Sequence, residues 1–349
     1  MKSNAEKTEN DLAVEEVTEF EVPDMPPRVI VDLRTDCNLK CPMCIVHGDT
    51  DNPKLDGFLK RDVDIDSLFR VVEEVAPHDP LMMASLWSEP LLAKAFKPYV
   101  EKLKEEGLTL ALNTNGLRIR KDFAEYLIDM DTGAIAVSVD ATTPETLMKV
   151  RGVDKLEKIQ NSVHMLLDAR GDKLSPRIGV SITVQDDNRH EVDAFVEHWI
   201  EYVDFVRVGE MYSVDGFAQI DTGMERKPCL ALYNTIAIHA DGNVPYCCLD
   251  GFSETSVGNA YEEGVHAVWH GEKMNQVRHW HETAQWDKVP FCKNCDRWAS
   301  YDFEETEKDG VLIRKSPEYT YYNRIDRLDN WGENLSGGLH DIPSEDAKD

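Results

Sequence analysis

Six apolar, strand-like runs alternate with amphipathic stretches between residues 28 and 210, and this rhythm most limits the folds open to the chain. Alternation of this kind is typical of βα units arranged around a parallel sheet. We therefore expect an α/β fold in which helices cover a sheet of six parallel strands. The strand candidates are residues 29–33, 81–86, 108–112, 134–139, 178–184 and 203–208.

Helical spacing of apolar residues predicts the covering helices. One apolar stripe runs from Leu68 to Val75 at positions i, i+3, i+4 and i+7. It begins behind a capping residue, Asp64 or Asp66, and stops before Pro77, so it predicts a helix with one buried face. Two further stripes lie at residues 156–167 and 192–200.

The chain is expected to divide into four parts. Residues 1–27 are strongly acidic and end in a proline-rich stretch, which predicts a flexible leader. After Gly209 the rhythm changes to short runs and turns, so a domain boundary is expected near residues 212–226. The expected parts are the leader at 1–27, the main α/β domain at 28–215, a small cysteine-bearing domain at 216–315, and a C-terminal extension with an acidic tail at 316–349.

An excess of acidic side chains excludes some classes of function. The formal net charge is -28, and such a chain repels nucleic-acid phosphates and anionic membrane surfaces. No apolar run approaches the roughly 18 residues of a membrane-spanning helix, and the start of the chain lacks the apolar core of a signal peptide. We therefore expect a cytoplasmic protein that binds neither nucleic acid nor membrane.

The eight cysteines fall into two groups separated by a long stretch without cysteine. Clustered thiolates in a reducing compartment indicate metal or redox chemistry. The first group, Cys37, Cys41 and Cys44, has the spacing Cys-x3-Cys-x2-Cys directly after the first strand. Three thiolates suit a cubane iron–sulfur cluster whose fourth iron stays open, since structural zinc sites usually close with four ligands. A zinc site completed by His47 is the alternative.

This loop resembles the signature of the radical S-adenosylmethionine (SAM) superfamily, at the place where that family carries it. The resemblance implies a partial (β/α)6 barrel in which Cys37, Cys41 and Cys44 hold a [4Fe-4S] cluster. In that family the open iron chelates SAM, and one electron from a partner such as flavodoxin or ferredoxin cleaves SAM to a 5'-deoxyadenosyl radical. Met43 replaces an aromatic residue that packs by the adenine in many members, and a thioether can still cover a base.

A turn after the second strand strengthens the resemblance. The sequence Trp-Ser-Glu-Pro at residues 87–90 is similar to the family's Gly-Gly-Glu-Pro turn. In the family this turn receives the methionyl ammonium of SAM. The resemblance therefore implies SAM-binding roles for Glu89 and Ser88.

Positions after the later strands are also similar to the family's pattern. The resemblance implies that Asn115 and Ser138 face the ribose or the carboxylate of SAM. Arg151 is suited to a charged hydrogen bond to that carboxylate. Residues 184–191 are similar to the segment that lies on the adenine side.

The second group consists of Cys229, Cys247, Cys248, Cys292 and Cys295. Four thiolates from separated segments can close either a complete [4Fe-4S] site or an all-cysteine zinc site. The pattern Cys-x12-Gly-x4-Cys followed by Cys-x2-Cys resembles the SPASM or twitch extension of radical SAM enzymes. The resemblance implies one auxiliary [4Fe-4S] cluster, held by all of the group except Cys248.

Cys248 has two interpretations beside that cluster. In an extended segment its side chain would point away from that of Cys247, and it would then be a small packing residue. Alternatively, its thiol returns a hydrogen atom to a substrate radical, as radical epimerases require. Spacing alone decides which of Cys247 and Cys248 is assigned to the cluster.

The resemblance implies an enzyme that abstracts hydrogen from a polar organic small molecule. The cysteine spacing is particularly similar to that of small dehydrogenases and epimerases that tailor aminocyclitols and sugars. Dehydrogenation of an alcohol is therefore the leading expectation. An epimerase that uses Cys248, modification of peptides or other natural products, and a zinc-stabilised binding scaffold are the alternatives. The catalytic base is unassigned: Asp32 and Arg34 share a face of the first strand, and Glu210 and Tyr212 follow the sixth, but salt bridges that line the barrel explain these residues equally well.

Overall fold

A curved ten-stranded sheet forms the centre of the computed structural model, which describes residues 20–84, 86–211 and 222–328. The sheet has the order β10-β11-β12-β6-β5-β4-β3-β2-β1-β7, and β8 pairs separately with β9. The strands are β1 (Arg28–Val31), β2 (Leu81–Met83), β3 (Leu110–Thr114), β4 (Ala134–Ser138), β5 (Arg177–Val184), β6 (Phe205–Glu210), β7 (Thr235–Ile238), β8 (Asn243–Pro245), β9 (Ser256–Asn259), β10 (Glu304–Lys308), β11 (Val311–Lys315) and β12 (Tyr319–Arg324).

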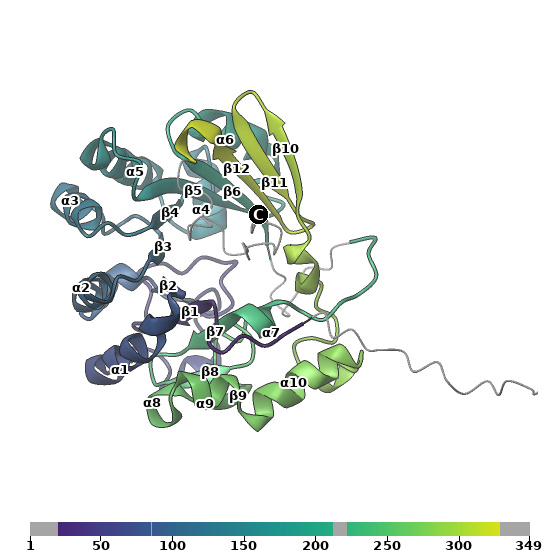
Figure 1. Cartoon of the computed structure of the whole chain (residues 1–349). Coiled ribbons are helices and arrows are strands. Elements are labelled where there is room, and N and C mark those ends of the chain that lie inside the picture. Colours follow the sequence, from purple (N-terminus) through teal and green to yellow (C-terminus); the bar gives the residue numbers. More distant parts are fainter. Residues whose placement is uncertain (1–19, 85, 212–221, 329–349) are drawn as a thin grey trace, which may run out of the picture.

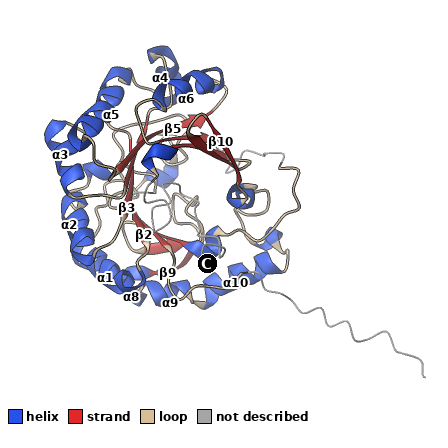
Figure 2. Ribbon diagram, turned by 45° about the horizontal axis from the view of Figure 1, so that its top comes forward, coloured by secondary structure: helices blue, strands red, loops and turns tan. Residues whose placement is uncertain are grey.

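The helices lie on the outer, convex face of this curved sheet (Figure 2). This arrangement of βα units confirms the expected partial α/β barrel, with β1 to β6 as the six predicted strands. The helices are α1 (Ile65–Val75), α2 (Phe96–Glu106), α3 (Lys121–Asp129), α4 (Pro144–Arg151), α5 (Leu156–Arg170), α6 (Val192–Trp199), α7 (Ala231–Asn234), α8 (Ala260–Glu263), α9 (Val265–Trp269) and α10 (Glu272–Glu282).

Helix α1 forms as its apolar spacing predicts. Asp64 is its N-cap, and the carboxylate accepts a hydrogen bond from the backbone N–H of Ser67 at 2.9 Å. The stripe from Leu68 to Val75 is buried against the sheet. The helix ends one residue before Ala76 and two before Pro77, because proline cannot donate the next backbone hydrogen bond.

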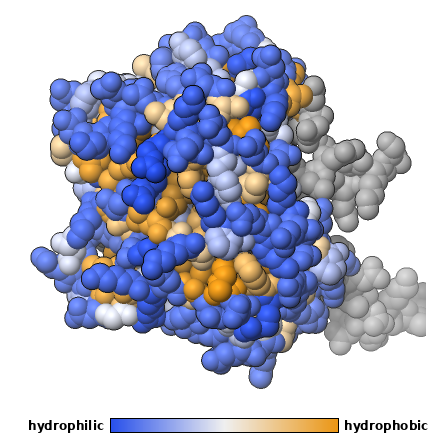
Figure 3. Space-filling model, turned by 90° about the vertical axis from the view of Figure 1, so that its left-hand side faces the viewer, coloured by the Kyte–Doolittle hydropathy of each residue, from blue (hydrophilic) through white to orange (hydrophobic). Residues whose placement is uncertain are grey.

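The first strand shows how the sheet separates the core from the barrel interior. Val29 and Val31 belong to the hydrophobic core between the sheet and the helices. Arg28 and Ile30 alternate with them, so their side chains point into the barrel. Seen from outside, the helical face is mostly hydrophilic, and hydrophobic atoms gather in the hollows between elements (Figure 3). Within the described residues, no helix is long and apolar enough to cross a membrane.

Two additions to the sheet were not expected from the sequence. Strand β7 pairs in parallel with β1, and β12 pairs antiparallel with β6, so both edges of the six-stranded barrel are covered. An open strand edge exposes unpaired backbone groups, and these additions satisfy them. The sequence predicted a boundary between residues 315 and 316. This point lies in the turn between the paired strands β11 and β12, and a domain boundary would not separate two paired strands.

The segment before β1 also differs from the flexible leader expected at 1–27. From residue 20 onward it packs on the domain surface, with Met25 buried in the core and the ring of Phe20 centred 5.1 Å from that of Tyr233. The indole Nε1 of Trp269 donates to the carbonyl of Pro23 at 2.9 Å. Residues 1–19, the boundary region 212–221 with Tyr212, and the tail from 329 lie outside the described residues.

Asp204 joins the C-terminal hairpin to the barrel. Its carboxylate accepts hydrogen bonds from the backbone N–H of Ile178 at 2.7 Å, from Arg170, and from Arg327 Nε at 2.9 Å. Its carbonyl accepts from the backbone N–H of Arg324 at 3.0 Å. Because Asp204 and Arg170 are both buried, each charge depends on the other for compensation.

We predict that Asp204→Asn lowers the free energy of unfolding by about 3–5 kcal/mol, since it leaves buried guanidinium groups without their counter-charge. Urea denaturation followed by circular dichroism measures this change. Asp168→Asn, on the exposed side of α5, is the matched control and should change stability by less than about 0.5 kcal/mol. Equal stability of the two variants would contradict the role given to Asp204.

Candidate functional site

The first cysteine group lies on a tightly wound loop at the carboxyl end of β1. The backbone N–H of Cys44 donates to the carbonyl of Cys41 at 2.8 Å, and that of Gly48 donates to the carbonyl of Cys44 at 2.9 Å. Two sulfurs also accept backbone hydrogen bonds, Cys37 from Leu39 at 3.4 Å and Cys44 from His47 at 3.3 Å. Such N–H···S bonds stabilise thiolates, so this loop suits cluster ligation.

His47 does not join the three thiols. Its imidazole is hydrogen-bonded to the backbone of Trp87, and burial lowers the pKa of His47. This hydrogen bond occupies one side of the imidazole, which favours three thiols without a fourth protein donor, as a cluster with one open iron requires, over a zinc site closed by His47.

One buried guanidinium faces the three thiols. Burial raises the pKa of Cys41 to about 11, and the charge of Arg151 opposes that rise. Arg151 is held by Asp140, with 2.5 Å between Nε and Oδ2, and the other oxygen of Asp140 accepts from the backbone N–H of Thr183 at 2.6 Å. Asp140 thus fixes the cation that stabilises negative charge at the first group.

Glu89 connects the ends of β2 and β3. The buried carboxylate accepts from Thr114 Oγ1 at 2.7 Å and from the backbone N–H of Asn115 at 2.8 Å. Asn115 in turn donates to Asn38 Oδ1 at 2.8 Å, beside Cys37. The structure therefore brings Glu89 and Asn115 together at the cysteine loop, as their predicted roles at SAM require.

Ser88 has a different partner. Its hydroxyl donates to Asp32 at 2.5 Å, and Asp32 is buried at the carboxyl end of β1. Burial raises the pKa of Asp32 to about 7, and the hydrogen bond from Ser88 opposes the rise. Arg34 pairs with Asp36 and Asp62 instead of Asp32. The sequence placed Asp32 and Arg34 on the same face of the first strand, but it did not show that the two side chains have different partners.

Residues 184–191, which were expected on the adenine side of SAM, lie near the first group. The amide Nε2 of Gln185 lies 3.0 Å from the sulfur of Met43, so residues 184–191 meet the cysteine loop. Ser138 lies on the neighbouring strand, and its hydroxyl accepts from Ser181 Oγ at 3.3 Å. These polar groups follow the carboxyl ends of β4 and β5, at the same edge of the sheet as the cysteine loop.

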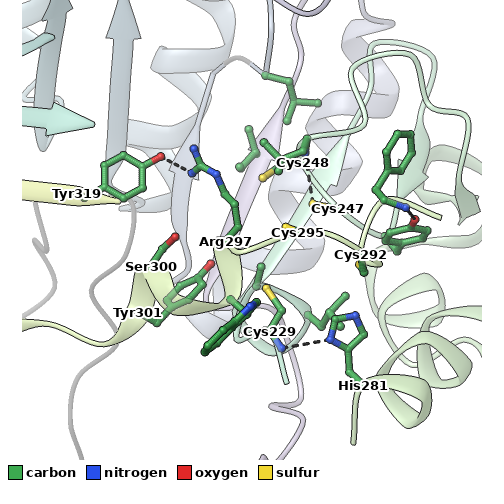
Figure 4. A pocket seen from close by; sticks show the side chains of 18 of the residues that line it. Cys229, Cys247, Cys248, His281, Cys292, Cys295, Arg297, Ser300, Tyr301 and Tyr319 are labelled. Atoms are coloured by element: carbon green, nitrogen blue, oxygen red, sulfur yellow. Dashed lines mark hydrogen bonds between the residues drawn. The ribbon is translucent and has the colours of Figure 1, made fainter. Parts of the chain in front are cut away.

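The second cysteine group surrounds one cavity (Figure 4). Cys229 precedes α7, Cys247 and Cys248 follow β8, and Cys292 and Cys295 lie in a turn after α10. All five line the same cavity, so three separated segments bring their thiols together. This set of donors fits a complete four-cysteine cluster site with one thiol to spare.

Cys248 does not point away from Cys247, contrary to expectation. The pair lies in a turn, in which the backbone N–H of Asp250 donates to the carbonyl of Cys247 at 3.1 Å. Both thiols face the cavity and are hydrogen-bonded to each other, which raises the pKa of Cys247 and lowers that of Cys248. Alternation of side chains applies to extended strands, and β8 ends at Pro245.

Two arginines beside this cavity were not singled out in the sequence. Arg28 is 5% exposed, and its guanidinium donates to Thr235 Oγ1 at 3.3 Å, while its Nε has no hydrogen-bond partner. Arg226 donates to the carbonyls of Cys292 and of Lys293. Among the described residues, neither arginine forms a salt bridge, and burial lowers the pKa of each.

The two cysteine groups are linked by Trp87. This residue follows β2 in the turn that contains Glu89, and its indole Nε1 donates to the carbonyl of Cys248 at 3.0 Å. Trp87 also lines the cavity of the second group. The similar turn of the family has glycine at this position. In this chain Trp87 stands there and joins the two cysteine groups.

Comparisons with known proteins agree with this arrangement. A model of the radical SAM superfamily matches residues 33–198, and a model of the iron–sulfur cluster-binding domain SPASM matches residues 229–296. GTP 3',8-cyclase of Yersinia pestis is 26% identical over 183 residues, which are 50% of this chain and 53% of that protein. The chain thus spans about half the length of this curated relative.

Solved structures share the fold. BtrN in complex with AdoMet and 2-DOIA aligns with a TM-score of 0.52 and 18% identity, over 78% of this chain and 93% of BtrN. SuiB of Streptococcus suis bound to S-adenosylmethionine aligns with a TM-score of 0.61 and 13% identity, over 75% of this chain and 70% of SuiB.

The fold and its two thiol sites define an iron–sulfur enzyme built on a partial α/β barrel. The chain belongs to the radical SAM superfamily and carries a C-terminal SPASM-type domain. Its cofactors are SAM and [4Fe-4S] clusters, one that binds SAM and one auxiliary.

We predict that Gly48→Ala removes the first cluster and leaves the second. A Cβ at Gly48 would lie 2.6 Å from the carbonyl oxygen of Cys44 and 2.7 Å from that of Pro42, so the loop must open. Iron content should fall from about eight to about four per chain. Thr50→Ala, at an exposed position two residues further along the same loop, is the control and should keep both clusters. Full iron content in Gly48→Ala would contradict the prediction.

Proposed function

We propose that this radical SAM enzyme dehydrogenates an alcohol carbon of a polar small molecule similar to a sugar or aminocyclitol. When bound, SAM and its cluster supply removal of a hydrogen atom from the substrate, and the auxiliary cluster supplies a one-electron acceptor. A flavodoxin or ferredoxin is the proposed reducing partner. The observation that carries the proposal is a pair of guanidinium groups beside the second cysteine group that form no salt bridge among the described residues: that of Arg28, which is buried, and that of Arg226, which is half-buried.

Arg28 and Arg226 favour an electron-accepting role for that group. A cluster with four thiolate ligands carries net negative charge, and each added electron increases it. Positive charge beside the cluster lowers the free energy of the reduced form, and the buried Arg28 contributes more than the half-buried Arg226 because water screens it less. An acceptor of this kind suits oxidation of the substrate better than simple return of a hydrogen atom.

The cavity lining suits a ring-shaped polar substrate. Aromatic side chains, among them Trp298, Tyr301 and Tyr319, line this cavity together with the cysteines, and they would contact the C–H groups of a ring bound beside the auxiliary cluster. Asn113, on the inner face of β3, adds an amide that can bind a hydroxyl group. Mostly apolar walls with few polar groups are usual in small-molecule sites.

Asp32 is the proposed acceptor of the hydroxyl proton. It lies on the inner face of β1 with Ile30, which lines the cavity. The pKa of about 7, raised by burial, allows this carboxyl to take up and release a proton near neutral pH. Ser88 holds it in place through the hydrogen bond at 2.5 Å.

Cys248 carries the second candidate function, a radical epimerase. The thiol lines the cavity together with the four proposed ligands, and this position supports a role as hydrogen-atom donor to a substrate bound there. Modification of a peptide or another natural product remains the broader alternative, because a shared fold does not determine a substrate.

We predict that replacing Cys37, Cys41 and Cys44 together with Ala abolishes SAM cleavage but leaves the chain folded. The barrel core between sheet and helices does not include these residues. With SAM and a chemical reductant, 5'-deoxyadenosine should fall to background, while circular dichroism stays unchanged. Cys248→Ala is the matched control and should keep cleavage. Continued 5'-deoxyadenosine formation by the triple variant would refute the assignment of this loop.

We further predict that Cys248→Ala keeps the oxidised product, because oxidation needs no hydrogen donor, and loses roughly 1 kcal/mol of stability as small core truncations do. Turnover of an aminocyclitol panel in deuterated water, analysed by mass spectrometry and NMR, tests this. The oxidised product should carry no deuterium at non-exchangeable carbons. Wild-type incorporation there, lost in Cys248→Ala, would identify the epimerase instead.

A further inference from the structure

A third cluster of metal-binding side chains lies where the segment before β1 crosses α9, apart from both cysteine groups. In the described part of the chain, Asp24, His266 and His270 each place one potential ligand atom within 4.8 Å of the others. We propose that these three residues bind a divalent transition-metal ion, with Zn²⁺ as the best match, and that His78 supplies a fourth donor. This proposal is independent of the proposed function.

The geometry brings the donors from three parts of the chain. His266 is the second residue of α9 and His270 is its C-cap, so the two are four residues apart on one side of the helix, and their ring centroids are 4.5 Å apart. The carboxylate of Asp24 lies between two imidazoles, 3.5 Å from His266 Nε2 and 3.7 Å from His78 Nδ1. Two imidazoles at this helical spacing form a chelating pair for zinc.

The surrounding residues hold the donors in place. Glu74 accepts hydrogen bonds from the backbone N–H groups of Val265 at 2.8 Å and His266 at 2.9 Å, which fixes the start of α9. The segment with Asp24 is held on the other side, because Trp269 Nε1 donates to the carbonyl of Pro23 at 2.9 Å. His270 Nε2 also lies 3.0 Å from the backbone carbonyl of Asp24, so an ion would replace this hydrogen bond or bind the other ring nitrogen, and His78, which lies outside the group of three, would have to rotate toward the ion.

The donor chemistry selects the class of ion. Three imidazoles and one carboxylate suit Zn²⁺, whereas Ca²⁺ and Mg²⁺ prefer oxygen ligands alone. Among the described residues, the ion pairs of Asp24 involve only His78 and His266, so no lysine or arginine competes with a cation there. A bound ion would fasten residues 20–27 to α9, and thereby tie the start of β1 to the SPASM-type domain.

Zinc titration of the reconstituted holoenzyme tests the proposal. Both clusters are loaded first under anaerobic conditions, so that the cysteines are occupied, and binding is measured by isothermal titration calorimetry. One Zn²⁺ per chain should bind. The double variant His266→Ala/His270→Ala should weaken this binding by at least about 100-fold, because loss of even an outer partner of a ligand costs about 10–100-fold. Asp24→Asn should weaken it by at least about tenfold.

A second measurement separates this site from scattered surface histidines. Zn²⁺ should slow hydrogen exchange of backbone amides in residues 20–27 of the wild type and have no such effect in the double variant. His190→Ala/His198→Ala, which removes two exposed histidines on and beside α6, is the matched control and should keep both effects. Unchanged zinc affinity in the His266→Ala/His270→Ala variant, or zinc binding without protection of residues 20–27, would overturn the proposal.

Discussion

The parallel register of β7 and β1 to β6 is the constraint on which the rest of the structure depends. Parallel strands end at one edge of the sheet, so the loops that follow them must meet there. The cysteine loop follows β1, Glu89 follows β2, Asn115 follows β3, and Gln185 follows β5 (Figure 1). Residues spread over half of the chain thus contact one another without any of them being close in sequence. The curvature of the sheet then encloses the space that these loops border.

The buried arginines of this protein are of two kinds, those with a carboxylate partner and those without one. Arg151 and Asp140 compensate each other, as do Arg170 and Asp204, and these pairs hold loops and strands in place. Arg28, in contrast, lies inside the barrel without a carboxylate partner among the described residues. An unpaired buried cation costs several kcal/mol unless an anion is bound nearby. A thiolate-ligated cluster supplies that anion. The buried guanidinium of Arg28 and the cofactor therefore stabilise each other.

The two cysteine groups form one connected unit. Trp87 lies in the turn after β2 and donates to the backbone of Cys248, so a change in either loop displaces the other. Strand β7 adds a second link, because it belongs to the C-terminal half of the chain but pairs with β1 along its whole length. Both links hold the second cysteine group against the barrel.

Local sequence determined the features whose parts are neighbours in the chain: the Cys37–Cys44 loop, the cap and stripe of α1, and the six barrel strands. Their signals are spacing and periodicity, which depend only on nearby residues. Tertiary structure alone decided what rests on distant pairing. It added β7 and β12 to the sheet edges, turned Cys248 toward the same cavity as Cys247, placed Arg28 near Cys248, and brought Asp24 to α9. The periodicity of apolar residues does not predict such contacts. They form only when the folded chain pairs the backbone groups of its strand edges and brings partners to its buried charges.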